Sequence, residues 1–216
     1  MNDRTYHRLK ESIYRGRLRP GQRIVERDLA RRMGVSRIPL RESLIRLETE
    51  GLVRSVPYSA TFVEDLSPVD MLEIYSMRLL LEPLATRLAA IKGDPSLVEK
   101  LKRLCDQMTR DTASGSMAQL DRTDYRFHHT IVLASGHKRL IRAYESAHIR
   151  IVGPQVDFAN VMKQPADTTA RDHMKIVEAI EQRDSATAEK LARESVRLGL
   201  RYVEQAIGMT LDQIQF

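Results

Sequence analysis

Residues 26–47, Glu26-Arg-Asp-Leu-Ala-Arg-Arg-Met-Gly34-Val-Ser-Arg-Ile-Pro-Leu-Arg41-Glu-Ser-Leu-Ile-Arg-Leu47, decide how the N-terminal part of the chain folds. They predict two short amphipathic helices joined by a tight turn at Gly34. Ser36 is a suitable N-cap for the second of these helices, and Pro39 lies in its first turn, where a missing N–H costs little. This pattern is typical of a helix-turn-helix, whose second helix offers its basic N-terminal end to the DNA major groove.

The residues on either side of this stretch complete a small winged module. Residues 3–15 have the apolar spacing of a helix, which Pro20 and Gly21 end. The third helix is expected to bury a stripe of four residues, Leu40, Leu44, Ile45 and Leu47. Two β-like runs, 52–56 and 60–63, then predict a wing. We therefore expect a winged helix-turn-helix domain over residues 1–66.

The remaining residues, 67–216, have the pattern of an all-α domain. Turns rich in Gly, Pro, Ser and Asp separate helices expected near residues 68–91, 95–113, 116–134, 137–152, 167–182 and 184–207. No strand-like alternation interrupts them. The predicted fold class is mainly α, with an N-terminal winged helix-turn-helix followed by an all-α helical bundle that binds an effector and dimerises.

Charge is concentrated where the DNA-binding module is expected. Residues 1–54 contain 13 Arg and one Lys against seven acidic residues, so they account for the whole net charge of +6. No apolar run approaches the roughly 18 residues of a membrane span, and the N-terminus lacks the apolar core of a signal peptide. The single cysteine, Cys105, forms no internal disulfide. We expect a cytoplasmic protein with no membrane partner.

Four residues are candidates for DNA contacts. Arg37 and Arg41 are four apart and share one helical face, from which arginine can form two hydrogen bonds to guanine. Ser36 and the N–H groups at the helix start could bind a phosphate, and Arg27 is placed for the DNA backbone. The alternative interpretation is that these charges only keep an amphipathic helical hairpin in solution.

The same stretch resembles the N-terminal winged helix of GntR-type bacterial transcription regulators. The resemblance rests on Pro20-Gly21, Glu26-Arg27-Asp28-Leu29-Ala30, Gly34-Val35-Ser36-Arg37-Ile38-Pro39-Leu40-Arg41-Glu42 and residues 47–53, and it extends through residues 5–64. It implies binding to a double-stranded DNA operator, with contacts at Arg27, Ser36, Arg37 and Arg41. The wing departs from the family pattern, because residues 57–60 are Pro-Tyr-Ser-Ala instead of a tip rich in Gly and Arg. We therefore expect little contact from the wing.

Three residues of the C-terminal part are candidate metal ligands. Asp124 and His128 are spaced i, i+4 and project from one helical face, while His173 lies on another expected helix. Carboxylate and imidazole donors suit Zn, Ni, Mn or Fe. From spacing alone, a solvated acid and two histidines satisfied by their neighbours remain the alternative.

This part resembles the FCD effector domain of the FadR-like GntR subfamily. The resemblance rests on Arg78…Leu81-Glu82…Ala85…Leu88-Ala89-Ala90, Asp124…Phe127-His128…Ala134-Ser135-Gly136 and His173…Ile176…Ala179-Ile180. Many members hold a divalent metal with one Asp and three His, and the metal helps to bind a carboxylate effector. The fourth ligand position falls at Ser195, which would leave three protein ligands, with water or the effector completing the set. The alternative is a metal-free pocket in which Ser195 and the histidines bind the ligand directly.

Arg78 is a further candidate for effector binding. An arginine on the inner side of the first helix of the bundle can bind a carboxylate through two parallel hydrogen bonds. A surface salt bridge with Glu73 or Glu82 is the alternative. The resemblance also implies that His137, which replaces the usual Asn after Ser-Gly, changes the floor of the pocket.

The sequence predicts a homodimeric regulator, more often a repressor in this family, whose DNA affinity responds to a small organic acid bound by the bundle. It is not expected to be an enzyme. Two rival functions remain open: a metal-dependent enzyme with a DNA-binding anchor, and an architectural DNA binder without an effector. The enzyme would need a base or nucleophile beside the metal, where Ser195 and Glu194 form no known catalytic pattern. The architectural protein would bind DNA with little sequence preference.

Overall fold

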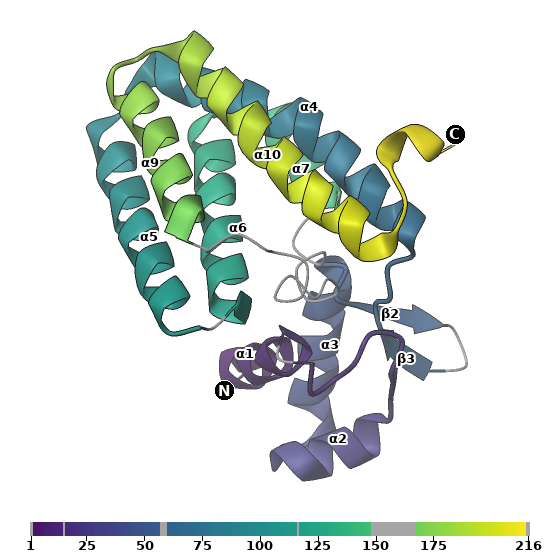
Figure 1. The fold of residues 1–216 in the computed structure, drawn as a ribbon. Helices are drawn as coiled ribbons and strands as arrows, with labels where there is room; N and C mark the ends of the chain where they lie inside the picture. Colours follow the sequence, from purple (N-terminus) through teal and green to yellow (C-terminus); the bar gives the residue numbers. More distant parts are fainter. Residues whose placement is uncertain (1, 15, 57–59, 116, 148–166, 215–216) are drawn as a thin grey trace. The chain divides into compact units, whose positions relative to one another are not determined.

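The computed structural model describes residues 2–14, 16–56, 60–115, 117–147 and 167–214. It confirms the mainly helical fold class, and the chain divides into two units, Met1–Ser67 and Pro68–Phe216 (Figure 1). In the part of the chain that the structure describes, no helix has both the length and the apolar composition that crossing a bilayer requires.

The N-terminal unit is a three-helix winged module. Its elements are α1 (Asn2–Tyr14), β1 (Arg23–Ile24), α2 (Glu26–Met33), α3 (Arg37–Thr49), β2 (Val53–Val56) and β3 (Ala60–Val63). The strands form an antiparallel sheet in the order β1-β3-β2, in which Val53 pairs with Val63. The wing expected from the sequence is therefore confirmed, whereas the two-residue strand β1 was not predicted. Residues 57–59 of the expected wing tip lie outside the described residues.

The turn between α2 and α3 depends on Gly34. Its φ of 66° is left-handed, and its N–H bonds the last carbonyls of α2. No atom lies within 4 Å of the position that a Cβ would occupy, so the backbone conformation alone favours glycine here. Ser36 is the N-cap of α3 with an extended backbone, but its side chain makes no capping hydrogen bond.

The prediction of which α3 residues are buried is wrong for one of the four. Leu40, Leu44 and Leu47 are buried as expected, but Ile45 is 62% exposed. At about 100° per residue, Ile45 lies roughly 140° around the helix from Leu40. Ser43 takes the inward position and donates a hydrogen bond to the Pro39 carbonyl.

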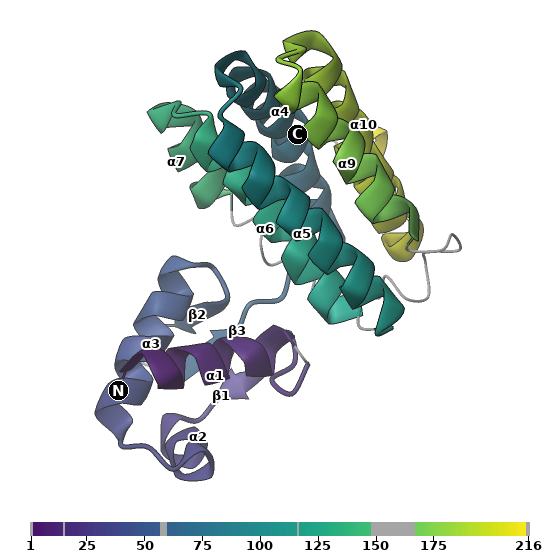
Figure 2. The ribbon, with the colours of Figure 1, turned by 90° about the vertical axis from the view of Figure 1, so that its left-hand side faces the viewer.

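The C-terminal unit is a helical bundle. Its elements are α4 (Pro68–Lys92), α5 (Pro95–Ala113), α6 (Met117–Ala134), α7 (Lys138–Ser146), α9 (Asp167–Glu181), α10 (Ser185–Ile207) and the short 3₁₀ helix η3 (Leu211–Gln213). Helices α4 and α10 lie side by side, and α5 packs against both α6 and α9 (Figures 1 and 2). Leu101, Met108, Phe127 and Ile180 fill the core between them. Of the helix expected over 137–152, residues 148–152 lie outside the described residues.

An internal proline links α4 to α10. Pro83 lies inside α4 and has no N–H, so the carbonyl of Leu79, four residues earlier, lacks its normal helical donor. Arg193 of α10 supplies the replacement, because its Nη1 donates to the Leu79 oxygen at 3.1 Å. The proline is therefore accommodated by a side chain from the neighbouring helix.

Candidate functional site

The basic start of α3 is exposed, as the sequence predicts. The side chains of Arg37 and Arg41 are each 64% exposed. Both face the carboxylate of Glu26 at the start of α2: Arg41 Nε donates to Glu26 Oε2 at 2.8 Å, and Arg37 Nη2 lies 3.9 Å from the same oxygen. One acidic residue thus holds two arginines on the same side of the helix-turn-helix.

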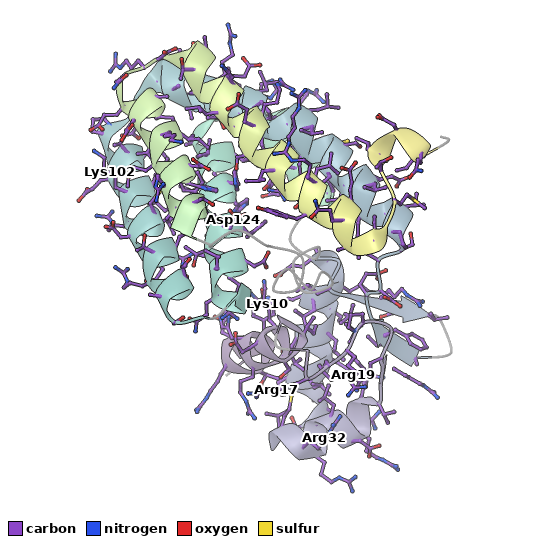
Figure 3. The ribbon with its side chains drawn as sticks, viewed as in Figure 1. Lys10, Arg17, Arg19, Arg32, Lys102 and Asp124 are labelled. Carbon is purple, nitrogen blue, oxygen red and sulfur yellow. The ribbon has the colours of Figure 1, made fainter. Side chains whose placement is uncertain are left out.

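Two other predicted DNA contacts lie nearby on the same unit. Arg27 is 83% exposed on α2 and has a 3.7 Å contact to Asp28. The Ser36 hydroxyl makes no hydrogen bond within the described part of the chain. Figure 3 shows further basic side chains on this unit, including Arg32 of α2. The surface therefore carries several cations and a free hydroxyl at the start of α3.

An apolar residue that was not predicted as a DNA contact lies between the two arginines. Ile38 is 71% exposed in the first turn of α3, where an apolar side chain gains nothing from water. In a major groove, such a side chain can contact a thymine methyl group. The spacing of Arg37 and Arg41 around Ile38 was a signal that could have identified it.

The three predicted metal ligands meet in the helical unit. Asp124 and His128 project from α6, and His173 projects from α9 (Figure 3 labels Asp124). Their donor atoms all lie within 4.8 Å of one another. His173 Nε2 is 3.1 Å from Asp124 Oδ1 and 3.0 Å from His128 Nε2, and His128 Nε2 is 3.8 Å from Asp124 Oδ1. Both imidazoles are buried, whereas the Asp124 side chain is 29% exposed.

The hydrogen bond at its second nitrogen shows which way the lone pair of His173 points. His173 Nδ1 donates to the Thr169 carbonyl at 2.7 Å, so its Nε2 presents a lone pair toward Asp124 and His128. His128 Nδ1 lies 3.0 Å from Glu82 Oε2, but this oxygen accepts no hydrogen bond in the described part of the chain, and either neutral tautomer of His128 fits. With the proton on its Nδ1, His128 presents a second lone pair to the cluster, where a cation could be bound.

The pKa values of the two histidines are shifted in opposite directions. Burial lowers the pKa of His128, which therefore favours its neutral form. Burial also acts to lower the pKa of His173, but the hydrogen bond and charge of Asp124 outweigh it and raise that pKa above its ordinary value. The two imidazoles in turn hold the pKa of Asp124 far below its usual range, although burial opposes them. In the absence of a cation, His173 is therefore the imidazole of the two that is more readily protonated.

Glu82 of α4 connects this cluster to Arg78. Arg78 Nε donates to Glu82 Oε1 at 2.7 Å, and the Tyr144 hydroxyl of α7 donates to the same oxygen at 3.3 Å. The Arg78 and Glu82 side chains are only 12% and 2% exposed, so the ion pair with Glu82, given above as the alternative to effector binding, is buried and not at the surface. Its second contact, to His128, was not predicted from the sequence.

The Arg78 guanidinium keeps free donors. Beyond the Nε bond to Glu82 and a 4.7 Å stacking contact with the Tyr75 ring, it makes no hydrogen bond within the described part of the chain. Its Nη1 and Nη2 can therefore donate to another group. A carboxylate is the group that matches this planar pair of donors.

Two other predicted positions have different surroundings. Ser195 is partly buried on α10, and its hydroxyl makes no hydrogen bond with any described residue. His137 is exposed and acts as N-cap of α7, because its Nδ1 accepts from the Leu140 N–H at 3.1 Å. This capping role of His137 was not predicted from the sequence.

The sequence and structure match known proteins over most of the chain. Residues 1–63 match the family described as bacterial regulatory proteins, gntR family, and residues 73–198 match the FCD domain. The chain is 28% identical over 190 residues to the uncharacterized HTH-type transcriptional regulator YdhC of Bacillus subtilis, covering 86% of this chain and 83% of that protein. It is 29% identical over 177 residues to the probable D-xylose utilization operon transcriptional repressor of Paenarthrobacter nicotinovorans, covering 82% and 77%. The solved structure of E. coli McbR/YncC has the same fold, with a TM-score of 0.77, 23% identity, and coverage of 94% and 97%.

Proposed function

Because this chain belongs to the gntR family of bacterial regulatory proteins and carries an FCD domain, we propose that it regulates transcription as a homodimer. In this proposal, the affinity of the dimer for its operator changes when the helical unit binds a small organic acid with the help of a metal ion. Relatives named as transcriptional regulators and as a repressor support the regulatory role. Family and relatives are regulators and not enzymes. We propose that binding of the protein to its operator represses transcription.

The residues around the start of α3 would contact different parts of the DNA. Arg37 and Arg41 read base edges, Arg27 and the Ser36 hydroxyl hold phosphates, and Ile38 contacts a thymine methyl group. The hydrogen bond of Arg41 to Glu26 and the 3.9 Å ion-pair contact of Arg37 with the same carboxylate support this assignment, because they keep both guanidinium groups near the start of α3 before DNA is bound. DNA would exchange these bonds for contacts with bases.

The metal part rests on the convergence of Asp124, His128 and His173. A tetrahedral site with bonds of about 2.0–2.1 Å separates its ligand atoms by roughly 3.3–3.4 Å. The observed separations of 3.0, 3.1 and 3.8 Å fit such a donor set. These three residues would hold a divalent cation, which supplies positive charge for a carboxylate when bound. Zn, Ni, Mn and Fe all suit the donors.

Arg78 would bind the carboxylate of the effector beside the metal site. Its Nε is held by Glu82, and its terminal nitrogens are free to bind a carboxylate. Ser195 leaves the fourth ligand position of the family without an imidazole, so a carboxylate or water would complete the set. A small acid with a second polar group would then contact both Arg78 and the Ser195 hydroxyl.

Zinc binding tests the site directly. We expect EDTA-treated protein to bind Zn²⁺ in isothermal titration calorimetry, and His173→Ala to weaken that affinity at least about a hundredfold. His137→Asn is the matched control, because Asn can also cap α7 and lies outside the cluster. Equal zinc affinity in wild type and His173→Ala would refute the metal site.

Sequence discrimination tests the DNA assignment. An operator selected from a random DNA library would be compared with a scrambled duplex by fluorescence anisotropy. Arg41→Ala is expected to reduce the ratio of the two affinities about tenfold or more, since a base contact contributes about 1–3 kcal/mol. Arg31→Ala, an exposed arginine of α2, should lower both affinities alike or leave them unchanged. Full discrimination by Arg41→Ala would rule out its base contact.

A further inference from the structure

The hydroxyl group of Tyr75 on α4 is nearly buried and has no partner. Tyr75 is 3% exposed, and its hydroxyl makes no hydrogen bond within the described part of the chain. Its oxygen is not one of the fully enclosed side-chain atoms without a partner, which among the described residues are Glu82 Oε2 and Thr112 Oγ1. A small opening therefore leads to the hydroxyl. A polar group in this position calls for a partner that the chain itself does not supply.

Gly199 of α10 makes room for this hydroxyl. Helices α4 and α10 lie side by side (Figure 1), and a Cβ at position 199 would lie 2.9 Å from the Tyr75 hydroxyl oxygen and 3.1 Å from Tyr75 Cε1. Glycine inside a helix is less favourable than alanine, because it loses more conformational freedom on folding. The chain thus accepts both an unbonded hydroxyl and an interior glycine, which packing of the two helices alone does not require.

The Tyr75 hydroxyl lies beside the groups proposed to bind the effector. Ser195 is four residues before Gly199 on the same face of α10, and its hydroxyl also makes no hydrogen bond with a described residue. The Arg78 guanidinium lies over the Tyr75 ring at 4.7 Å. Burial raises the pKa of Tyr75 to about 12, Arg78 opposes the rise and the charge of Asp124 adds to it. Asp124 is therefore close enough to act on the phenol.

The two side chains of α4 would bind different groups of a ligand. The terminal nitrogens of Arg78 form a planar pair that matches one carboxylate. The Tyr75 hydroxyl extends from the edge of the ring over which the guanidinium lies, so it needs an acceptor apart from that carboxylate. An acid with only an alkyl chain beyond its carboxylate would leave the hydroxyl unbonded.

We propose that Tyr75 selects the effector, by donating its hydroxyl hydrogen to a second oxygen-bearing group of an acid whose carboxylate binds Arg78. The effector is thus a bifunctional acid, whose second group is a hydroxyl or another carboxylate. This inference rests on the proposed function, in which the acid carries a second polar group, and it adds the residue that recognises that group. A site with a polar group that needs a partner discriminates strongly against ligands that lack one.

Calorimetry with three four-carbon acids tests the selection. Butyrate, 3-hydroxybutyrate and succinate share a carboxylate and differ in the second group. We expect zinc-loaded protein to bind 3-hydroxybutyrate and succinate at least about fivefold more tightly than butyrate. Tyr75→Phe should remove most of this preference and leave the affinity for butyrate unchanged. Equal affinity for the three acids in wild type, or binding of none, would overturn the bifunctional class, and an undiminished preference in Tyr75→Phe would overturn the role of Tyr75.

Stability separates ligand binding from a structural role of the hydroxyl. Tyr75→Phe keeps the ring and its contact with Arg78, so the urea midpoint of the acid-free protein should stay the same or rise. Tyr6→Phe in the winged unit is the matched control, because the Tyr6 hydroxyl donates to Glu50. This variant should lower stability and leave the affinity for all three acids unchanged. A clear loss of stability in Tyr75→Phe would mean that the hydroxyl has a partner within the protein, contrary to the proposal.

Gly199→Ala tests the same contact from α10. The added Cβ would press on the Tyr75 hydroxyl, so the preference for 3-hydroxybutyrate and succinate should fall about as far as in Tyr75→Phe. In a Tyr75→Phe background, Gly199→Ala should change the preference little further, because the two changes act on one hydrogen bond. A full preference in Gly199→Ala would contradict the placement of the hydroxyl. Circular dichroism checks that each variant is folded.

Arg78→Lys separates this inference from the proposed function. The lysine keeps a cation beside Glu82 but lacks the pair of terminal donors, so binding of all three acids should weaken alike, about tenfold or more. Unweakened binding by Arg78→Lys would contradict the effector site of the proposed function. Weakened binding by Arg78→Lys, together with an unchanged preference in Tyr75→Phe, would overturn only the selection by Tyr75.

Discussion

At the residue scale, Glu82 connects the arginine proposed to bind the effector with the residues proposed to bind a metal. Its Oε1 accepts from Arg78 and Tyr144, while its Oε2 faces His128 Nδ1 at 3.0 Å. A carboxylate in contact with the second nitrogen of a ligating imidazole fixes the tautomer and raises the basicity of the other nitrogen. One side chain of α4 thus positions both the arginine proposed to bind a carboxylate and the histidine proposed to bind a metal.

Glu82→Gln should separate these roles. We expect the zinc dissociation constant to rise about 10–100-fold, because the amide holds His128 less strongly in the tautomer that binds metal. Stability to urea should also fall, since Arg78 loses a buried counter-ion, a change that typically costs about 3–5 kcal/mol. Glu73→Gln on the exposed side of the same helix is the control. If zinc affinity stays unchanged, Glu82 serves only to neutralise Arg78.

The raised pKa of His173 predicts how zinc binding depends on pH. In the metal-free protein, protonated His173 contributes stability below its unfolded pKa of about 6.5, and this contribution is lost as pH rises through the raised folded pKa. Zinc binds only the neutral imidazole, so protons compete with it below that raised pKa. His128, whose pKa burial lowers, stays neutral and adds no such competition.

Zinc should therefore raise the melting temperature more at pH 8 than at pH 6. Differential scanning fluorimetry with zinc or EDTA at each pH measures this difference. His173→Ala should abolish both the zinc-induced shift and its pH dependence. An equal zinc-induced shift of the melting temperature at the two pH values would show that the metal does not displace a proton from His173.

At the element scale, α4 and α10 are joined by the contact that Pro83 makes necessary. Arg193→Met should destabilise the protein by about 1 kcal/mol, because the Leu79 carbonyl loses the donor at 3.1 Å. In a Pro83→Ala background, the restored N–H can bond the Leu79 carbonyl, and the same Arg193 substitution should cost less. Urea unfolding of the four proteins gives the coupling. Additive effects would show that Arg193 stabilises α10 by other contacts, such as its 3.3 Å pair with Glu189.

The elements differ in how well the sequence predicted them. Gly34 and Pro39 are local signals, and they located α2 and α3 because cap and turn conformations depend on a few adjacent residues. Strand β1 was missed, since a two-residue strand is defined only by its pairing with β3. The Asp124 and His128 spacing was readable on α6, but the contact of His128 with Glu82 of α4 depends on how two helices pack.

At the scale of the whole molecule, the connection between the two units is short. Strand β3 ends at Val63 and α4 begins at Pro68, so four residues separate the wing from the helix that carries Arg78 and Glu82. The first of the four is tied to the winged unit, because the Glu64 N–H donates to the Leu52 carbonyl at 3.0 Å. A shift of α4 on ligand binding would therefore act directly on the winged unit.

Zinc alone should reveal this coupling. If zinc changes operator affinity by some factor, typically about 5–150, operator DNA must change zinc affinity by the same factor. Inserting Gly-Ser-Gly-Ser between Leu66 and Ser67 should leave each affinity intact when measured alone, but bring the factor close to one. The same insertion between Ser114 and Gly115, in the turn after α5, is the control and should preserve the factor. Undiminished coupling in the Leu66 insertion would mean that the signal passes between the units by contacts other than this connection.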